Sequence, residues 1–135
     1  METTNYKKQI TNKFQISSAP KVYDLEERTF LFARDVALAT KKLQGNQSSL
    51  EYRKQVVRSS GSVGANYIEA NESLSKKDFL MRIKICRKEA KESAYWLRLL
   101  SETNDAISAQ LLSPLHQEAI ELKKIFSAMI EKTSS

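Results

Sequence analysis

The side chains that most often carry catalysis or metal binding are scarce in this sequence. Its 135 residues include one histidine and one cysteine. A carboxylate-bridged pair of metal ions is a common site of helical bundles, and the sequence offers for it Glu69, Glu72, Glu89, Glu92 and His116. That site needs a Glu from each of two helices and a Glu-x-x-His motif on each of the other two. Because one histidine cannot complete it, we expect no metal and no cofactor.

Two other features resemble reactive or phosphate-binding groups but are better explained by packing. Residues 61–64 read Gly-Ser-Val-Gly, like the GxxG of a KH loop, yet that loop belongs to a fold with a β-sheet. Two glycines inside a helix each cost about 1 kcal/mol relative to alanine, so we expect a close helix–helix contact there. Cys86 lies among regularly spaced apolar residues and is expected to be a buried thiol. No nucleophile–base pair is evident, and we expect no enzymatic activity.

Polar residues at helical spacing predict a structural network between the second and third helices. Glu89 and Glu92 lie on one strip of the third helix, and Arg58, Asn66 or nearby serines are suited to pair with them. Such a network, if buried, fixes helix register, and removal of one partner costs about 3–5 kcal/mol. The residues assigned to it are Arg58, Ser59, Asn66, Glu69, Glu89 and Glu92.

A row of basic residues on the third helix is the clearest candidate binding feature. Five cations and one aromatic residue fall within an arc of about 80° at 100° per residue, opposite the predicted apolar face, and extend over about 30 Å. They are Lys77, Lys84, Lys88, Lys91, Tyr95 and Arg98. These cations are suited to contact phosphates, and the tyrosine is suited to stack on a base. The alternative is a solvated helix face without a ligand.

The elements that position these groups are predicted to be helices. Three glycines, two prolines and the lack of strict polar–apolar alternation argue against a sandwich or barrel. Apolar residues recur at spacings of three and four, which is typical of amphipathic helices. Four helices are predicted, over residues 22–44, 49–71, 76–103 and from 113 onward. Their predicted N-caps are Asp24, Ser49, Ser75 and Ser113, the last followed by Pro114 at the first helical position.

Charge and composition complete the prediction of class and compartment. The formal net charge is +6, and the surplus is concentrated in residues 1–21 and 76–103. Residues 1–21 are interpreted as a flexible N-terminal arm and residues 22–132 as one domain, an all-α antiparallel up-down four-helix bundle. No signal peptide or membrane span is evident, and a single cysteine suits a reducing compartment. We therefore expect a cytoplasmic protein without a membrane partner.

Three blocks of sequence, residues 23–30, 58–70 and 75–97, resemble the bacterial four helix bundle protein family. That family is related to proteins encoded in intervening sequences of 23S ribosomal RNA genes. The resemblance implies a left-turning antiparallel bundle assembled as a homopentamer, and it attaches no enzymatic activity to the network residues named above. The family is also similar to the accessory protein of diversity-generating retroelements, a basic pentamer that binds nucleic acid and a reverse transcriptase.

Two functions are compatible with these features. The first is a non-catalytic oligomeric scaffold that binds RNA or DNA through the basic row, assisted by the lysines of the arm. The alternative is a protein–protein adaptor that organises another polypeptide without nucleic acid. Its binding surface would be the termini or a strip on the third helix that consists of Met81, Ile85, Trp96 and Leu99.

Overall fold

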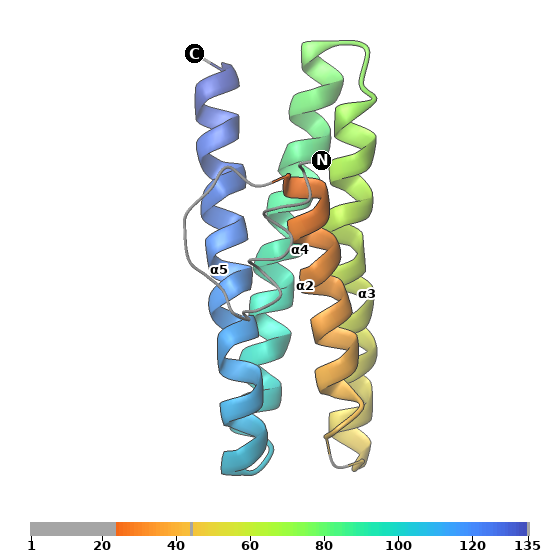
Figure 1. Cartoon of the computed structure of the whole chain (residues 1–135), viewed down its shortest axis with the longest axis vertical. Coiled ribbons are helices and arrows are strands. Elements are labelled where there is room, and N and C mark those ends of the chain that lie inside the picture. Colours follow the sequence, from red (N-terminus) through yellow and green to blue (C-terminus); the bar gives the residue numbers. More distant parts are fainter. Residues whose placement is uncertain (1–23, 44, 135) are drawn as a thin grey trace.

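The computed structural model describes residues 24–43 and 45–134, and this part of the chain folds into four helices. They are α2 (Leu25–Thr40), α3 (Gln47–Asn71), α4 (Lys76–Glu102) and α5 (Ala106–Ser134). Successive helices run in opposite directions along one long axis, so the α3–α4 connection lies at one end and the other two connections at the opposite end (Figure 1). The all-α antiparallel four-helix bundle is confirmed. The predicted arm, residues 1–21, lies outside the described residues.

The core is formed by one apolar strip from each helix. Residues three or four apart lie on the same helical face, so the spacing seen in the sequence brings these side chains inside. Val36, Val63, Ile83 and Leu122 are fully buried representatives of α2, α3, α4 and α5. Phe126 is the largest of the fully buried side chains, and its ring lies 6.2 Å from that of Tyr67 on α3.

Helix α2 is the shortest, with 16 residues against 25 to 29 in the others, and covers only part of the bundle's length (Figure 1). It contacts both of its neighbours, α3 and α5. Arg28 donates to both carboxylate oxygens of Glu118 on α5, at 2.7 and 2.9 Å. A Cβ added to Gly64 would lie 2.9 Å from Thr29 Oγ1, so α2 and α3 approach closely there. The predicted close contact is confirmed at Gly64 and is wrong at Gly61, where an added Cβ meets nothing within 4 Å.

Two of the predicted helix starts are confirmed. Asp24 Oδ1 accepts a hydrogen bond from the backbone N–H of Glu26 at 3.0 Å. Ser75 Oγ accepts one from the N–H of Asp78, also at 3.0 Å. These bonds satisfy N–H groups that have no partner within the first turn of a helix.

The other two predicted starts are too late in the sequence. Helix α3 is capped by Asn46, whose Oδ1 accepts from the N–H of Ser49 at 2.7 Å. Helix α5 begins at Ala106, where Asp105 Oδ1 accepts from the N–H of Ser108 at 2.8 Å. Pro114 therefore lies inside α5 rather than at its first position. The additional turns bring Leu112 into the core.

In the described residues, no helix is sufficiently long and apolar to cross a membrane.

Candidate nucleic-acid interface

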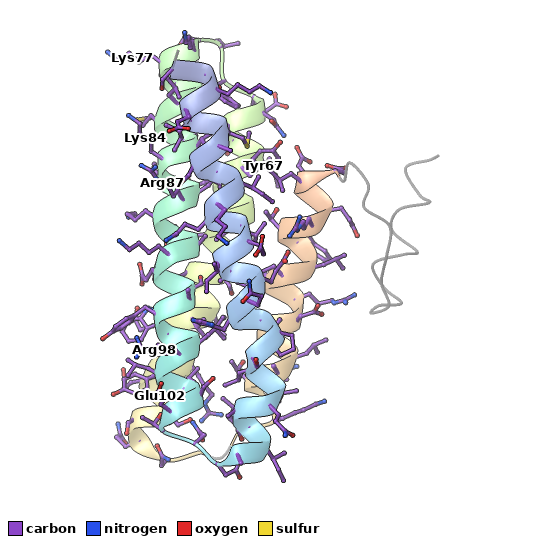
Figure 2. All side chains as sticks on the ribbon, turned by 90° about the vertical axis from the view of Figure 1, so that its left-hand side faces the viewer. Tyr67, Lys77, Lys84, Arg87, Arg98 and Glu102 are labelled. Atoms are coloured by element: carbon purple, nitrogen blue, oxygen red, sulfur yellow. The ribbon has the colours of Figure 1, made fainter. Side chains whose placement is uncertain are left out.

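The outward face of α4 carries the predicted basic row. All six of its residues are exposed, and Figure 2 shows Lys77, Lys84 and Arg98 along the outer side of the helix. Met81 and Glu102 are exposed on the same row, because they continue its spacing of three and four residues. The row, defined from here on as residues 77, 84, 88, 91, 95 and 98, faces away from the core. The same spacing rule could have identified Met81 and Glu102 from the sequence.

Few carboxylates compete for these cations. Within the described residues, Lys77, Lys84 and Lys91 form no ion pair. Lys88 Nζ lies 3.6 Å from Glu89 Oε2, and Arg98 Nε lies 3.5 Å from Glu102 Oε2. The exposed Arg98–Glu102 pair contributes at most about 1 kcal/mol, and the Lys88 side chain stays 68% exposed beside its buried partner. The row is therefore available to an anionic ligand along its whole length.

Tyr95 is the aromatic member of the row, and its ring is held by a second aromatic layer. The residue is 58% exposed, and its ring meets that of Trp96 edge to face at 5.0 Å. Trp96 in turn stacks on Tyr52 of α3 at 5.8 Å and donates from Nε1 to Glu92 Oε2 at 2.9 Å. Sequence reasoning did not assign these supporting roles to Trp96 and Tyr52, because the contact between them joins two helices. The result is an exposed aromatic ring on a rigid base among cations.

Beside the row, Arg58 of α3 pairs with two carboxylates of α4. Its Nη2 lies 2.5 Å from Glu92 Oε2 and 3.3 Å from Glu89 Oε1. Glu89 is only 6% exposed, and its Oε1 accepts no hydrogen bond in the described residues, so Arg58 supplies the positive charge that faces Oε1, while Lys88 faces Oε2. The hydrogen bond to Glu92 is the main cause of a raised pKa for Arg58, although desolvation opposes it. The Arg58 guanidinium and the Glu92 carboxylate therefore both stay charged at neutral pH.

The pKa of Glu92 lies below its ordinary value for the same reason. Partial burial would raise this pKa, but the hydrogen bonds from Trp96 and Arg58 outweigh burial and hold it down. Glu92 thus connects the aromatic support of Tyr95 to the charge pair between the helices.

The remaining members of the predicted network fall into two groups. Ser59 and Ser93 share a hydrogen bond of 2.8 Å between their hydroxyls, and Ser93 donates to the carbonyl of Glu89 at 2.9 Å. Asn66 lies apart and accepts from Arg82 Nη1 at 3.0 Å. Glu69 is exposed. The structure therefore brings together Arg58, Ser59, Glu89 and Glu92, and places Asn66 and Glu69 toward the other end of α3.

The site holds no reactive thiol. Cys86 is fully buried, and burial raises the pKa of its thiol to about 12, so it is not a thiolate at neutral pH. In the part of the chain that the structure describes, no three His, Cys, Asp or Glu side chains come together as a metal-binding group.

The fold and this surface define a class of protein: an antiparallel four-helix bundle with a basic outer face on its third helix. The chain belongs to the 23S rRNA-intervening sequence protein family, whose model matches residues 22–128. This match extends through most of α5, beyond the blocks recognisable by eye. No curated protein matches the sequence.

A solved structure from Bacteroides thetaiotaomicron is similar to this chain. It is described as a protein with unknown function from the S23 ribosomal protein family. The two share 31% sequence identity with a TM-score of 0.70, and the similarity covers 79% of this chain and 98% of the other. The shared fold thus comes with a family whose function is not established.

Proposed function

We propose that this protein is a non-catalytic oligomeric scaffold of the bacterial cytoplasm that binds RNA, or another nucleic acid, through the basic row of α4. The observation that carries the proposal is the continuous exposure of five cations and Tyr95 on one face of a single helix. Lys77 and Arg98, the first and last members of the row, are 21 positions apart, or about 32 Å along a straight helix. Cations spread over this length are suited to contact several phosphates of one strand.

Tyr95 favours a ligand with unpaired bases. A base stacked on an aromatic side chain contributes about 1–3 kcal/mol, irrespective of its sequence. Because Trp96 and Tyr52 support Tyr95, little conformational freedom is lost when a base stacks on it. The description of the family refers to intervening sequences of 23S rRNA, so a structured fragment of that RNA with single-stranded loops is the natural first probe.

We further propose that the protein acts as a homo-oligomer, with the pentamer that the family resemblance implies. Every additional copy repeats the basic row, so one long ligand can engage several rows at once. Engagement of a second row then becomes intramolecular, which increases overall affinity without any new type of contact. Light scattering should give a mass of several times the 15.4 kDa of one chain.

The test of binding is a gel shift with two matched variants. Lys84→Gln/Lys88→Gln/Lys91→Gln removes three charges from the row, and Lys42→Gln/Lys124→Gln/Lys132→Gln removes three elsewhere. We expect the first variant to lose at least tenfold in affinity for the 23S rRNA fragment and the second to lose much less. Equal losses would contradict the row as the binding site.

The alternative function, a protein–protein adaptor, is less well supported by the strip of α4 that would form its binding surface. Met81 is half exposed, but Trp96 packs against the core and Ile85 and Leu99 are partly buried, so the strip is not one open apolar face. A pull-down that is enriched in one protein and insensitive to nuclease would favour the adaptor over the nucleic-acid scaffold.

A further inference from the structure

Glu92 lies beside the exposed ring of Tyr95 and is held in place by two hydrogen-bond donors. The two residues are three positions apart on α4, which makes their side chains neighbours on the helix surface. Trp96 contacts both of them, since its ring meets that of Tyr95 at 5.0 Å and its Nε1 donates to Glu92 Oε2 at 2.9 Å. Arg58 Nη2 donates to the same oxygen. The carboxylate therefore has a fixed position next to the aromatic ring.

The two oxygens of this carboxylate are used differently. Oε2 accepts both hydrogen bonds, whereas Oε1 accepts none within the described residues. The Glu92 side chain is 30% exposed, so a ligand can approach Oε1. Although partial burial opposes ionisation, the hydrogen bonds from Trp96 and Arg58 hold the pKa of Glu92 below its ordinary value, and the group is charged at neutral pH. Beside the platform on which a base can stack, Oε1 is thus a charged acceptor open to a ligand.

An acceptor at this place distinguishes one nucleobase from another. Proteins read single-stranded RNA by stacking bases on aromatic side chains and by hydrogen bonds to the edges of those bases. A carboxylate accepts from an exocyclic amino group, such as the one on C4 of cytosine. Uracil has the same ring size but carries O4 at that position, and O4 is itself an acceptor. Because two acceptors that face each other repel, Glu92 Oε1 favours cytosine over uracil.

The neighbouring cations suit the phosphates of the same strand. Lys91 precedes Tyr95 by one helical turn and Arg98 follows it by one turn, so a cation lies on either side of a stacked base. Within the described residues, Lys91 forms no ion pair and Arg98 pairs with the exposed Glu102 at 3.5 Å. The base contact and the phosphate contacts therefore lie on one continuous face of α4.

We infer that Tyr95 and Glu92 form a recognition site for an unpaired base that carries an exocyclic amino group, with cytosine preferred to uracil. Tyr95 supplies the stacking surface, and Glu92 Oε1 accepts a hydrogen bond from the amino group. The inference rests on the proposed function, since the strand that presents the base is held by the basic row. It adds base selectivity to phosphate and stacking contacts, which by themselves are independent of sequence.

The test compares cytidine and uridine decamers, because a homopolymer presents the same base to Tyr95 wherever the strand binds. In fluorescence anisotropy titrations at neutral pH, we expect the cytidine decamer to bind about fivefold more tightly than the uridine decamer. A decamer that contains pyrimidin-2-one, which is cytosine without its amino group, should lose most of this advantage. This third ligand removes the hydrogen-bond donor without any change to the protein.

The Glu92→Gln variant should do more than weaken binding. Because Trp96 Nε1 and Arg58 Nη2 both donate to the position of Oε2, the amide oxygen of the new side chain takes that position. The amide NH2 group then stands in place of Oε1, and this donor matches O4 of uracil rather than the amino group of cytosine. We expect the preference for cytidine to disappear or to reverse. A purely structural role of Glu92 would change both affinities by the same factor.

Two further variants make the outcome specific. Glu102→Gln removes an exposed carboxylate from the same face of α4 and should leave the ratio of the two affinities unchanged. Tyr95→Ala should weaken both decamers and reduce the preference, because a base no longer stacks beside Glu92. Circular dichroism should show the same helicity in every variant.

The inference is overturned if the original protein binds the cytidine and uridine decamers equally, or if Glu92→Gln keeps the preference for cytidine. Either result leaves the proposed function intact when Lys84→Gln/Lys88→Gln/Lys91→Gln still weakens the binding of both decamers. Failure of both decamers to bind contradicts the proposed function and the base site together.

Discussion

Arg58 on α3 lies 2.5 Å from Glu92 on α4, and the same guanidinium lies 3.3 Å from the buried Glu89. One side chain thus compensates two carboxylates and joins α3 to α4. Glu92 also accepts a hydrogen bond from Trp96 Nε1, and the Trp96 ring contacts the ring of Tyr95 edge to face. The register of α3 against α4 and the orientation of the exposed tyrosine therefore depend on one polar cluster.

The replacement Arg58→Met should lower the free energy of unfolding by about 2 kcal/mol, because it leaves the exposed Lys88, 3.6 Å away, as the remaining positive charge that faces the buried Glu89. The midpoint of urea unfolding measures this effect. Adding Glu89→Gln to the same chain should recover more than half of the loss, since the buried charge that Arg58 no longer compensates is then removed. An unchanged midpoint for Arg58→Met would show that the pair does not stabilise the bundle.

The lowered pKa of Glu92 predicts a pH dependence of stability. A carboxylate whose native pKa lies below its ordinary value of 4.5 stabilises the fold at higher pH, and this stabilisation is lost as pH falls through the native pKa. We expect the free energy of unfolding to fall between about pH 5 and pH 3, and to fall less steeply in Glu92→Gln. Glu131→Gln, which removes an exposed carboxylate of α5, is the control; an equal change of slope in both would contradict the assignment.

The contact between Gly64 and Thr29 predicts a steric effect. Gly64→Ala would place a methyl group 2.9 Å from Thr29 Oγ1 and should destabilise the bundle by about 1–3 kcal/mol, despite the better helix propensity of alanine. Thermal unfolding measures the loss. Thr29→Ala in the same chain removes the hydroxyl and should restore part of it. If Gly64→Ala raises the melting temperature instead, α2 and α3 are not as close as the structure shows.

Pro114 inside α5 predicts a stabilising replacement. Proline lacks the N–H that a helix interior uses and clashes with the preceding turn, at a cost of about 3 kcal/mol in an exposed helix. Pro114→Ala should therefore raise the free energy of unfolding by about 1–3 kcal/mol. A decrease would indicate that the proline shapes α5 to fit the core.

The sequence was sufficient to predict the bundle and the exposed row, because both follow from the three- and four-residue periodicity of a single helix. It also indicated the pairing of Arg58 with Glu89 and Glu92 between two helices, but it was insufficient for other contacts of that kind. The pairing of Asn66 with Arg82, the stacking of Trp96 on Tyr52 and the space around Gly61 all depend on how neighbouring helices are placed.

The helix starts illustrate a different limit. Pro114 is favourable at a first helical position, and this local preference predicts a helix start at Ser113. In the structure the helix begins at Ala106, and Asp105 caps this start. The additional turns place Leu112 in the core. Burial outweighs the local cost of the proline, and a single sequence does not show this balance. Asp105 could have indicated the true start, because an Asp side chain at the N-cap accepts a hydrogen bond from the N–H three residues later, here that of Ser108.

Contact between the basic row of α4 and phosphates makes binding dependent on salt concentration. For a single-stranded ligand, the logarithm of affinity falls with the logarithm of salt concentration with a slope of about −0.7 for each phosphate neutralised. In fluorescence titrations with a 23S rRNA fragment, Lys84→Gln/Lys88→Gln/Lys91→Gln should therefore flatten the slope by about 2 units. An unaltered slope for this variant would show that these three lysines do not contact phosphates.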